Sequence, residues 1–183
     1  MTKKPMLKII LIAIPILLVI FIIIVAMQPS SYQVTRSLAI AAPPGALFPH
    51  MNDLKKWEAW NPWGKADPNI KLTYGGPASG VGASYSWAGN NEVGEGRATI
   101  TESRPSKSVK YKMEFFKPMS GTSEMEFTFK PQGNQTEVTV TVSGDKSFMA
   151  KAFCLFMSMD KMIGGKFEKA LAELKGIAEV PAK

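Results

Sequence analysis

The chain has 183 residues, a formal net charge of +7 and a single cysteine, and 45% of its residues are hydrophobic. One cysteine excludes an internal disulfide, and a chain of this length is typical of one domain with its own hydrophobic core. The lysines are scattered and accompany no aromatic and basic motif, so a nucleic-acid-binding protein is not expected, whereas a solvated surface near anionic lipid is.

The first element is an apolar segment at residues 9–27, nineteen uncharged residues built mostly from Ile, Leu and Val. A helix rises about 1.5 Å per residue, so this segment spans most of a hydrocarbon core about 30 Å thick. Lys3, Lys4 and Lys8 precede it, and positive flanks stay in the cytoplasm. The sequence therefore predicts a cytoplasmic N-terminus (residues 1–8), a transmembrane anchor (9–27), a linker (28–31) and an exported domain (32–179).

The alternative for this segment is a cleaved secretory signal. The apolar region of such a signal is about 7–15 residues long and ends in small residues. Residues 9–27 are longer, and the sequence MQPS at 27–30 matches a cleavage site poorly. We expect a single-pass protein of the plasma (inner) membrane, with its domain in the periplasm or an equivalent extracytoplasmic space.

The exported domain is predicted to be α+β. Residues 32–41 alternate as a strand, and residues 46–52 and 54–60 form two short helices. A long helix is expected at residues 149–179, followed by a tail at 180–183. Between them lie further segments of period-two alternation, separated by Gly, Pro, Asn and Ser, which are typical of antiparallel strands: residues 69–74, 83–88, 94–102, 108–116, 123–130 and 137–143.

One face of this sheet is expected to be apolar and covered by the final helix. The helix carries an apolar stripe formed by Phe153, Phe156, Met157, Ile163, Phe167, Leu171 and Leu174. The apolar face of the sheet is rich in aromatic and Met side chains, which either fill a solid core or line a cavity. These side chains include Tyr85, Trp87, Tyr111, Met113, Phe115, Met125 and Phe127.

Two charged residues interrupt the predicted apolar surfaces. Asp160 falls within the stripe of the final helix, and Arg36 falls on the apolar face of the first strand. An unpaired buried carboxylate is costly, so the two residues are predicted to form an ion pair or a polar spot in a cavity. The alternative is that both reach solvent, Asp160 by a rotation of the helix and Arg36 at the edge of the sheet.

The order of these elements and several local sequences resemble the START-like superfamily, also called SRPBCC and including birch-pollen-allergen-like and polyketide cyclase/dehydrase proteins. The resemblance covers residues 32–179. It implies a helix-grip fold, a curved antiparallel sheet wrapped around a long C-terminal helix, with a deep cavity for lipids, sterols or polyketides. The matching sequences are IAAPP at 40–44, LF at 47–48, MND at 51–53, WEAWNPW at 57–63, GVGA at 80–83 with Trp87, GEG at 94–96, and GGKFEKAL at 164–171 with LK at 174–175.

The predicted function is binding of a hydrophobic small molecule or lipid between the sheet and the final helix. The candidate ligand-binding residues are those of the sheet face above together with Phe153, Met157, Asp160 and Arg36. One alternative is a cyclase or hydratase that uses Asp160 as acid or base, assisted by Tyr85 or Tyr111. Another is a protein-interaction module whose cavity has degenerated.

No metal and no cofactor are expected. His50 is the only histidine and Cys154 the only cysteine, and they lie far apart in the sequence. A zinc site needs several such ligands at defined spacings. Cys154 lies among apolar residues, which is typical of a small hydrophobic side chain, and no protein partner is indicated.

Overall fold

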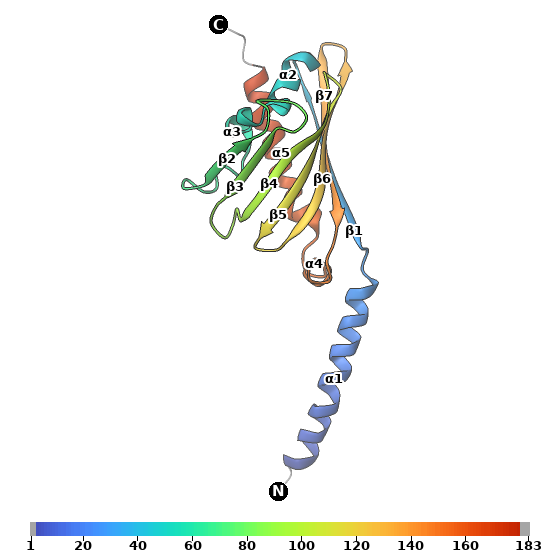
Figure 1. The fold of residues 1–183 in the computed structure, drawn as a ribbon. Helices are drawn as coiled ribbons and strands as arrows, with labels where there is room; N and C mark the ends of the chain where they lie inside the picture. Colours follow the sequence, from blue (N-terminus) through green and yellow to red (C-terminus); the bar gives the residue numbers. More distant parts are fainter. Residues whose placement is uncertain (1–2, 180–183) are drawn as a thin grey trace.

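The computed structural model describes the backbone of residues 3–179 and the side chains of residues 11–179. Helix α1 (Lys3–Met27) leads through a short connection into an α+β domain, shown in Figure 1. The predicted tail at 180–183 lies outside the described residues, and so do residues 1–2 of the predicted cytoplasmic segment.

The domain is built on one sheet of seven antiparallel strands in the order β1-β7-β6-β5-β4-β3-β2. All seven predicted strands are present, with ends that differ from the prediction by at most two residues, and the predicted α+β class is confirmed. The strands are β1 (Ser31–Ile40), β2 (Lys71–Gly75), β3 (Ser84–Ala88), β4 (Glu95–Arg104), β5 (Ser108–Lys117), β6 (Gly121–Gln132) and β7 (Gln135–Asp145).

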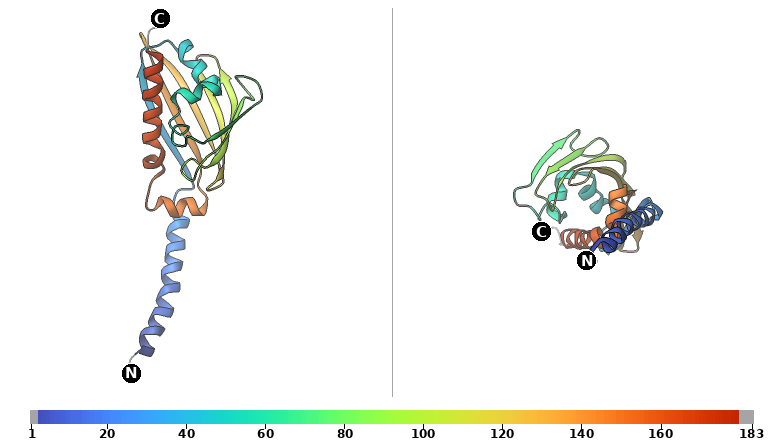
Figure 2. Two further views of the ribbon diagram at one scale, coloured as in Figure 1. Left: turned by 90° about the vertical axis from the view of Figure 1, so that its left-hand side faces the viewer. Right: turned by 90° about the horizontal axis from the view of Figure 1, so that it is seen from below.

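The two faces of the sheet differ as the alternation predicts. Tyr111, Phe127 and Val140 are buried on the inner face. Their sequence neighbours point to the opposite face because successive strand residues alternate. Figure 2 shows the sheet curving around the helices that cover this apolar face.

Three short helices follow β1: α2 (Pro44–Asn52), a 3₁₀ turn (Leu54–Lys56) and α3 (Trp57–Trp60). Trp57 and Trp60 are buried with ring centroids 5.6 Å apart, and Trp57 also contacts Tyr85 and Tyr111 on the sheet. The tryptophans therefore wedge these helices against the sheet.

The final helix is broken, which corrects the prediction of one helix at 149–179. It consists of α4 (Phe148–Cys154) and α5 (Met159–Ala178). The hydroxyl of Ser158 accepts a hydrogen bond from the Lys161 amide at 3.3 Å and caps α5. Serine favours this position because its side chain satisfies an amide that has no partner within the helix.

The break divides the predicted apolar stripe. Phe167, Leu171 and Leu174 are buried on α5 under the sheet, as predicted. Phe156 and Met157 instead lie in the exposed segment between the two helices.

Helix α1 extends away from the domain (Figures 1 and 2). The C-terminal end of α1 contacts α4, and Val25 at this end is fully buried. The amide of Lys146 donates to the carbonyl of Ser30 at 2.7 Å, which ties the connection to the end of β7. Within residues 3–179, no helix has the combination of length and apolarity that a membrane span requires.

Candidate functional site

A cavity of about 450 Å³ lies between the inner face of the sheet, the loop after α3, and helices α4 and α5. The strands contribute aromatic and Met side chains because the inward positions of β3, β5 and β6 carry these residue types. Ile163 and Phe167 of α5 close the opposite side. The interior is therefore not a fully packed core, which decides between the two possibilities that the alternation left open.

Seven of the eleven predicted ligand-binding residues line this cavity, and their role in binding remains a prediction. They come from three strands and α4: Tyr85, Trp87, Met113, Phe115, Met125, Phe127 and Phe153. Four do not line it, namely Tyr111, Met157, Asp160 and Arg36.

Tyr111 is a structural residue of the core. Its hydroxyl donates to the carbonyl of Met51 at 2.7 Å, and its ring centroid lies 5.0 Å from that of Trp57. Burial raises the pKa of Tyr111 well above its ordinary value. A buried phenol already engaged with backbone is unavailable for acid or base chemistry.

Several cavity residues were not among the sequence candidates. Trp57, Trp60 and Trp63 line the cavity from α3 and the loop that follows it. Their spacing of three residues, which places side chains on one face of a helical segment, was the available signal. The loop residues Val93 and Met119 also line the cavity, and no periodic pattern marks them.

The cavity holds a few polar groups among its apolar walls. The hydroxyl groups of Tyr32 and Ser123 form a hydrogen bond of 2.7 Å with each other. The indole N–H of Trp60 is buried and has no hydrogen-bond partner among the residues that the structure describes. Burial, with a smaller contribution from Glu58, raises the pKa of Tyr85 to about 12.

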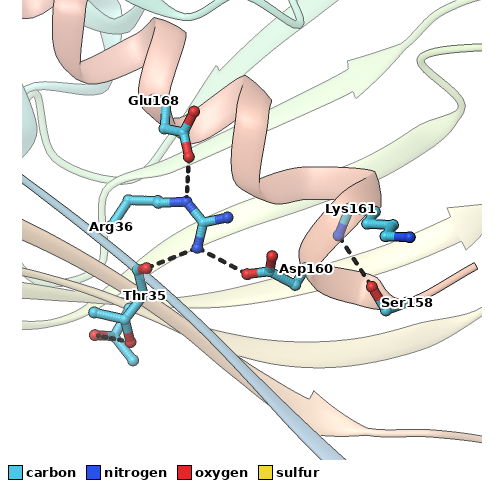
Figure 3. Close-up of polar contacts among 7 residues, drawn as sticks. Thr35, Arg36, Ser158, Asp160, Lys161 and Glu168 are labelled. Carbon is cyan, nitrogen blue, oxygen red and sulfur yellow. Dashed lines mark hydrogen bonds and ion pairs between the residues drawn. The ribbon is translucent and has the colours of Figure 1, made fainter.

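Arg36 joins β1 to α5, as Figure 3 shows. Its Nη1 donates to Asp160 Oδ1 at 2.8 Å and to the carbonyl of Thr35 at 2.9 Å, while its Nε donates to Glu168 Oε1 at 2.6 Å. The predicted pairing of Arg36 with Asp160 is confirmed. Glu168 was missed, although it lies two helical turns after Asp160 on the same face of α5.

The pair is not buried, which agrees with the alternative that the sequence left open, namely that Asp160 reaches solvent or Arg36 lies at the edge of the sheet. The Asp160 side chain is 58% exposed and that of Arg36 is 23% exposed. Because the helix breaks before Ser158, Asp160 falls in the first turn of α5, where a carboxylate is favourable near the helix N-terminus. Arg36 lies on β1, an edge strand, and reaches the helix from the side of the sheet.

Asp160→Asn should lower the melting temperature at neutral pH but not at strongly acidic pH. The hydrogen bond from Arg36 lowers the pKa of Asp160 below its ordinary value. A depressed folded-state pKa stabilises the protein above the ordinary carboxyl pKa, and this stabilisation is lost as pH falls through the lowered value. Thermal unfolding of both chains across pH tests this; a difference that persists unchanged into strong acid would contradict it.

Gly164 provides the space in which the Arg36 guanidinium lies. It is placed one turn after Asp160 and one turn before Glu168, and a Cβ built on it would overlap the guanidinium. A Cβ on the neighbouring Gly165 meets nothing within 4 Å. Substituting each glycine by alanine therefore gives a matched pair of variants on one helix, of which only the one at Gly164 disturbs Arg36.

Gly165→Ala should raise the free energy of unfolding by about 0.8–1 kcal/mol, the difference in helix propensity between the two residues. Gly164→Ala gains the same propensity but displaces Arg36 from both carboxylates, so it should be less stable than Gly165→Ala. Adding Arg36→Ala to each should bring the two alanine variants to equal stability. If Gly164→Ala and Gly165→Ala are equally stable with Arg36 present, the close approach has no energetic consequence.

The comparisons with known proteins concern the whole α+β domain. Residues 31–179 match the family described as polyketide cyclase/dehydrase and lipid transport. The chain belongs to this family. No curated protein sequence matches it. This match confirms the predicted resemblance of the domain to the SRPBCC superfamily.

Solved structures share this domain's fold at low sequence identity. The Aha1 dimer from Colwellia psychrerythraea has a TM-score of 0.59 and 19% identity, covering 83% of this chain and 99% of that one. Protein jhp0584 from Helicobacter pylori has a TM-score of 0.60 and 12% identity, covering 81% and 88%. Protein CV1439 from Chromobacterium violaceum has a TM-score of 0.56 and 14% identity, covering 84% and 99%. At such identities the likeness concerns the fold alone.

Proposed function

We propose that the protein binds a hydrophobic small molecule or a lipid in the cavity between the sheet and α5, and holds it beside a membrane. The observation that carries this proposal is the cavity of about 450 Å³ with its aromatic and Met lining. Ligand pockets are typically about 300–1,000 Å³ and mainly apolar. The family description, which includes lipid transport, supports the same class of ligand.

The lining also favours a ligand with one polar end. Apolar atoms moved from water into the cavity gain about 25 cal/mol per Å² of buried surface. The hydroxyl groups of Tyr32 and Ser123 bond each other, and one of the two O–H groups is left to donate to an acceptor on the ligand. A fatty acid or another acyl lipid combines these two properties.

The membrane part of the proposal rests on the sequence of residues 9–27. These nineteen residues are uncharged and follow three lysines. The large apolar side chains of α1 are exposed from Leu11 to Met27, with Val25 covered. An N-terminus in the cytoplasm would place the domain on the outer side of the plasma membrane.

The two other predicted functions gain no support. A cyclase or hydratase using Asp160 needs this carboxylate at the ligand, but Asp160 does not line the cavity and is paired with Arg36. Acid or base catalysis at neutral pH also needs a group with a suitable pKa, whereas the pKa of Tyr85 is raised to about 12. An interaction module with a degenerate cavity does not fit an open volume of this size.

Native mass spectrometry of the full chain extracted in detergent tests ligand binding. We expect the protein to carry a co-purified lipid, or to take up an added fatty acid with one-to-one stoichiometry. A chain that carries no lipid and takes up no fatty acid would overturn the proposal.

Reporter fusions after Lys183 test the orientation separately. Alkaline phosphatase should be active there in bacteria, and green fluorescent protein exported through the general secretory route should be dark. The reverse pair of results would overturn the proposed orientation, while material beginning near Ser30 would identify residues 1–29 as a cleaved signal.

A further inference from the structure

Exposed apolar side chains gather at one end of the domain. Of the ten exposed large apolar side chains that the structure describes beyond α1, all but Val81 and Ile177 lie at the end where β1 begins and β7 finishes. The antiparallel order places the β5–β6 turn at the same end. We call six of them the apolar rim: Met119, Phe148, Met149, Phe153, Phe156 and Met157.

The apolar rim is continuous with the cavity. Met119 of the β5–β6 turn and Phe153 of α4 belong to the rim and also line the cavity. Figure 2 shows α4 lying crosswise between α1 and the end of the sheet. Apolar side chains therefore continue from the outside of α4 into the cavity, beside polar lining residues such as Lys117 and Asp145.

The rim is too exposed to contribute to the core. Phe156 is 85% exposed and Met149 is 68% exposed. Contiguous exposed apolar patches on soluble surfaces are uncommon and mark interaction sites. These side chains therefore have the character of an interaction surface.

Two observations favour lipid as the partner that covers this surface. Helix α1, whose exposed surface is apolar, leaves the domain at this end and contacts α4. Residues 145–160 contain Lys146 and Lys151 between Asp145 and Asp160, and Asp160 is paired with Arg36. Basic residues beside an apolar surface are attracted to the anionic headgroups of a bilayer, whereas a second copy of this basic chain would repel them.

We propose that the apolar rim inserts into the bilayer, so that the cavity opens directly into lipid. This proposal rests on the proposed function, because it makes the rim the entrance for the ligand that the cavity binds. An acyl chain then passes from the membrane into the cavity without crossing water. The segment 155–158, which joins α4 to α5, lies at this entrance and belongs to neither helix.

The first test measures the depth of the rim in the full chain reconstituted into vesicles. The vesicles contain phosphatidylcholine with a minority of phosphatidylglycerol, with or without bromine on the acyl chains. Phe156→Trp adds a fluorophore on the rim, and Val81→Trp adds one at another exposed position, at the opposite end of the domain. Brominated lipid should quench the added fluorescence of Phe156→Trp and not that of Val81→Trp. Equal quenching, or none at either position, would overturn the proposal.

The second test separates entry from binding. The double variant Met149→Asp with Phe156→Asp changes only exposed side chains, and Val81→Asp is its control. A fluorescent fatty acid should move from vesicles into the double variant roughly tenfold more slowly or worse, while its affinity at equilibrium is unchanged. Unchanged transfer rates would overturn the rim proposal. A parent chain that binds no fatty acid although Phe156→Trp is quenched would overturn the proposed function and leave the rim in lipid.

Discussion

Ile163→Trp is expected to weaken binding of a fluorescent fatty acid by about tenfold or more, equivalent to at least about 1.4 kcal/mol. Ile163 lines the cavity from α5, where a larger ring would occupy the space that the ligand needs. The same change should leave the melting temperature equal or higher, because a ring in an empty apolar space restores contacts with its walls. Fluorescence titration and thermal unfolding of the full chain measure the two effects.

Ile177→Trp is the matched control. It makes the same substitution on the same helix, but Ile177 is exposed and does not line the cavity. We expect its affinity for the fatty acid to equal that of the parent chain. If both variants bind as tightly as the parent, the ligand does not occupy this cavity.

Trp57→Ala should lower the free energy of unfolding by about 3–5 kcal/mol, the usual range for removing a buried aromatic side chain. Trp57 is buried, and its ring centroid lies 5.0 Å from that of Tyr111, 5.6 Å from Trp60 and 6.1 Å from Tyr85. Removing it leaves a void where α3 meets the sheet. Denaturant unfolding followed by near-ultraviolet circular dichroism of the remaining aromatic residues measures the loss.

Trp63→Ala provides the comparison for Trp57→Ala. Trp63 is only partly buried and packs against Phe167 with ring centroids 5.2 Å apart. Its removal should cost clearly less than that of Trp57. Equal losses at the two positions would show that α3 is not anchored by Trp57.

The strands were predictable because their alternation and their breaks agree. Gly133 and Asn134, for example, separate β6 from β7 in both the prediction and the structure. Period-two alternation assigns each side chain to a face, so the inward positions of Met113 and Met125 also follow from the sequence. Local pattern and tertiary packing impose the same arrangement here.

The break between α4 and α5 was not predicted because apolar residues continue across it. Phe153, Phe156 and Met157 fit the spacing of a continuous helix, and only Ser158 marks the start of a new one. The error moved Asp160 from the expected buried stripe to an exposed first turn. Its pairing with Arg36 was nevertheless predictable, because two charges on facing apolar surfaces favour each other as partners.

The residue pattern alone could not establish the cavity, which only the family resemblance implied. Aromatic and Met residues at inward positions are compatible with a packed core as well as with an open space. Loop residues in the ranges 89–94 and 118–120 also line the cavity. These loops carry no periodic pattern, so their contribution to the lining required the structure.

Photolabelling of the full chain in vesicles tests the central claim most directly, namely that the cavity between the sheet and α5 holds the ligand. A fatty acid carrying a diazirine near its methyl end is bound, irradiated and located by peptide mass spectrometry. We predict labels on cavity-lining residues such as Met113, Met125 and Ile163, which an excess of unlabelled fatty acid removes. Labels confined to α1 and the apolar rim, or not reduced by competition, would contradict the account.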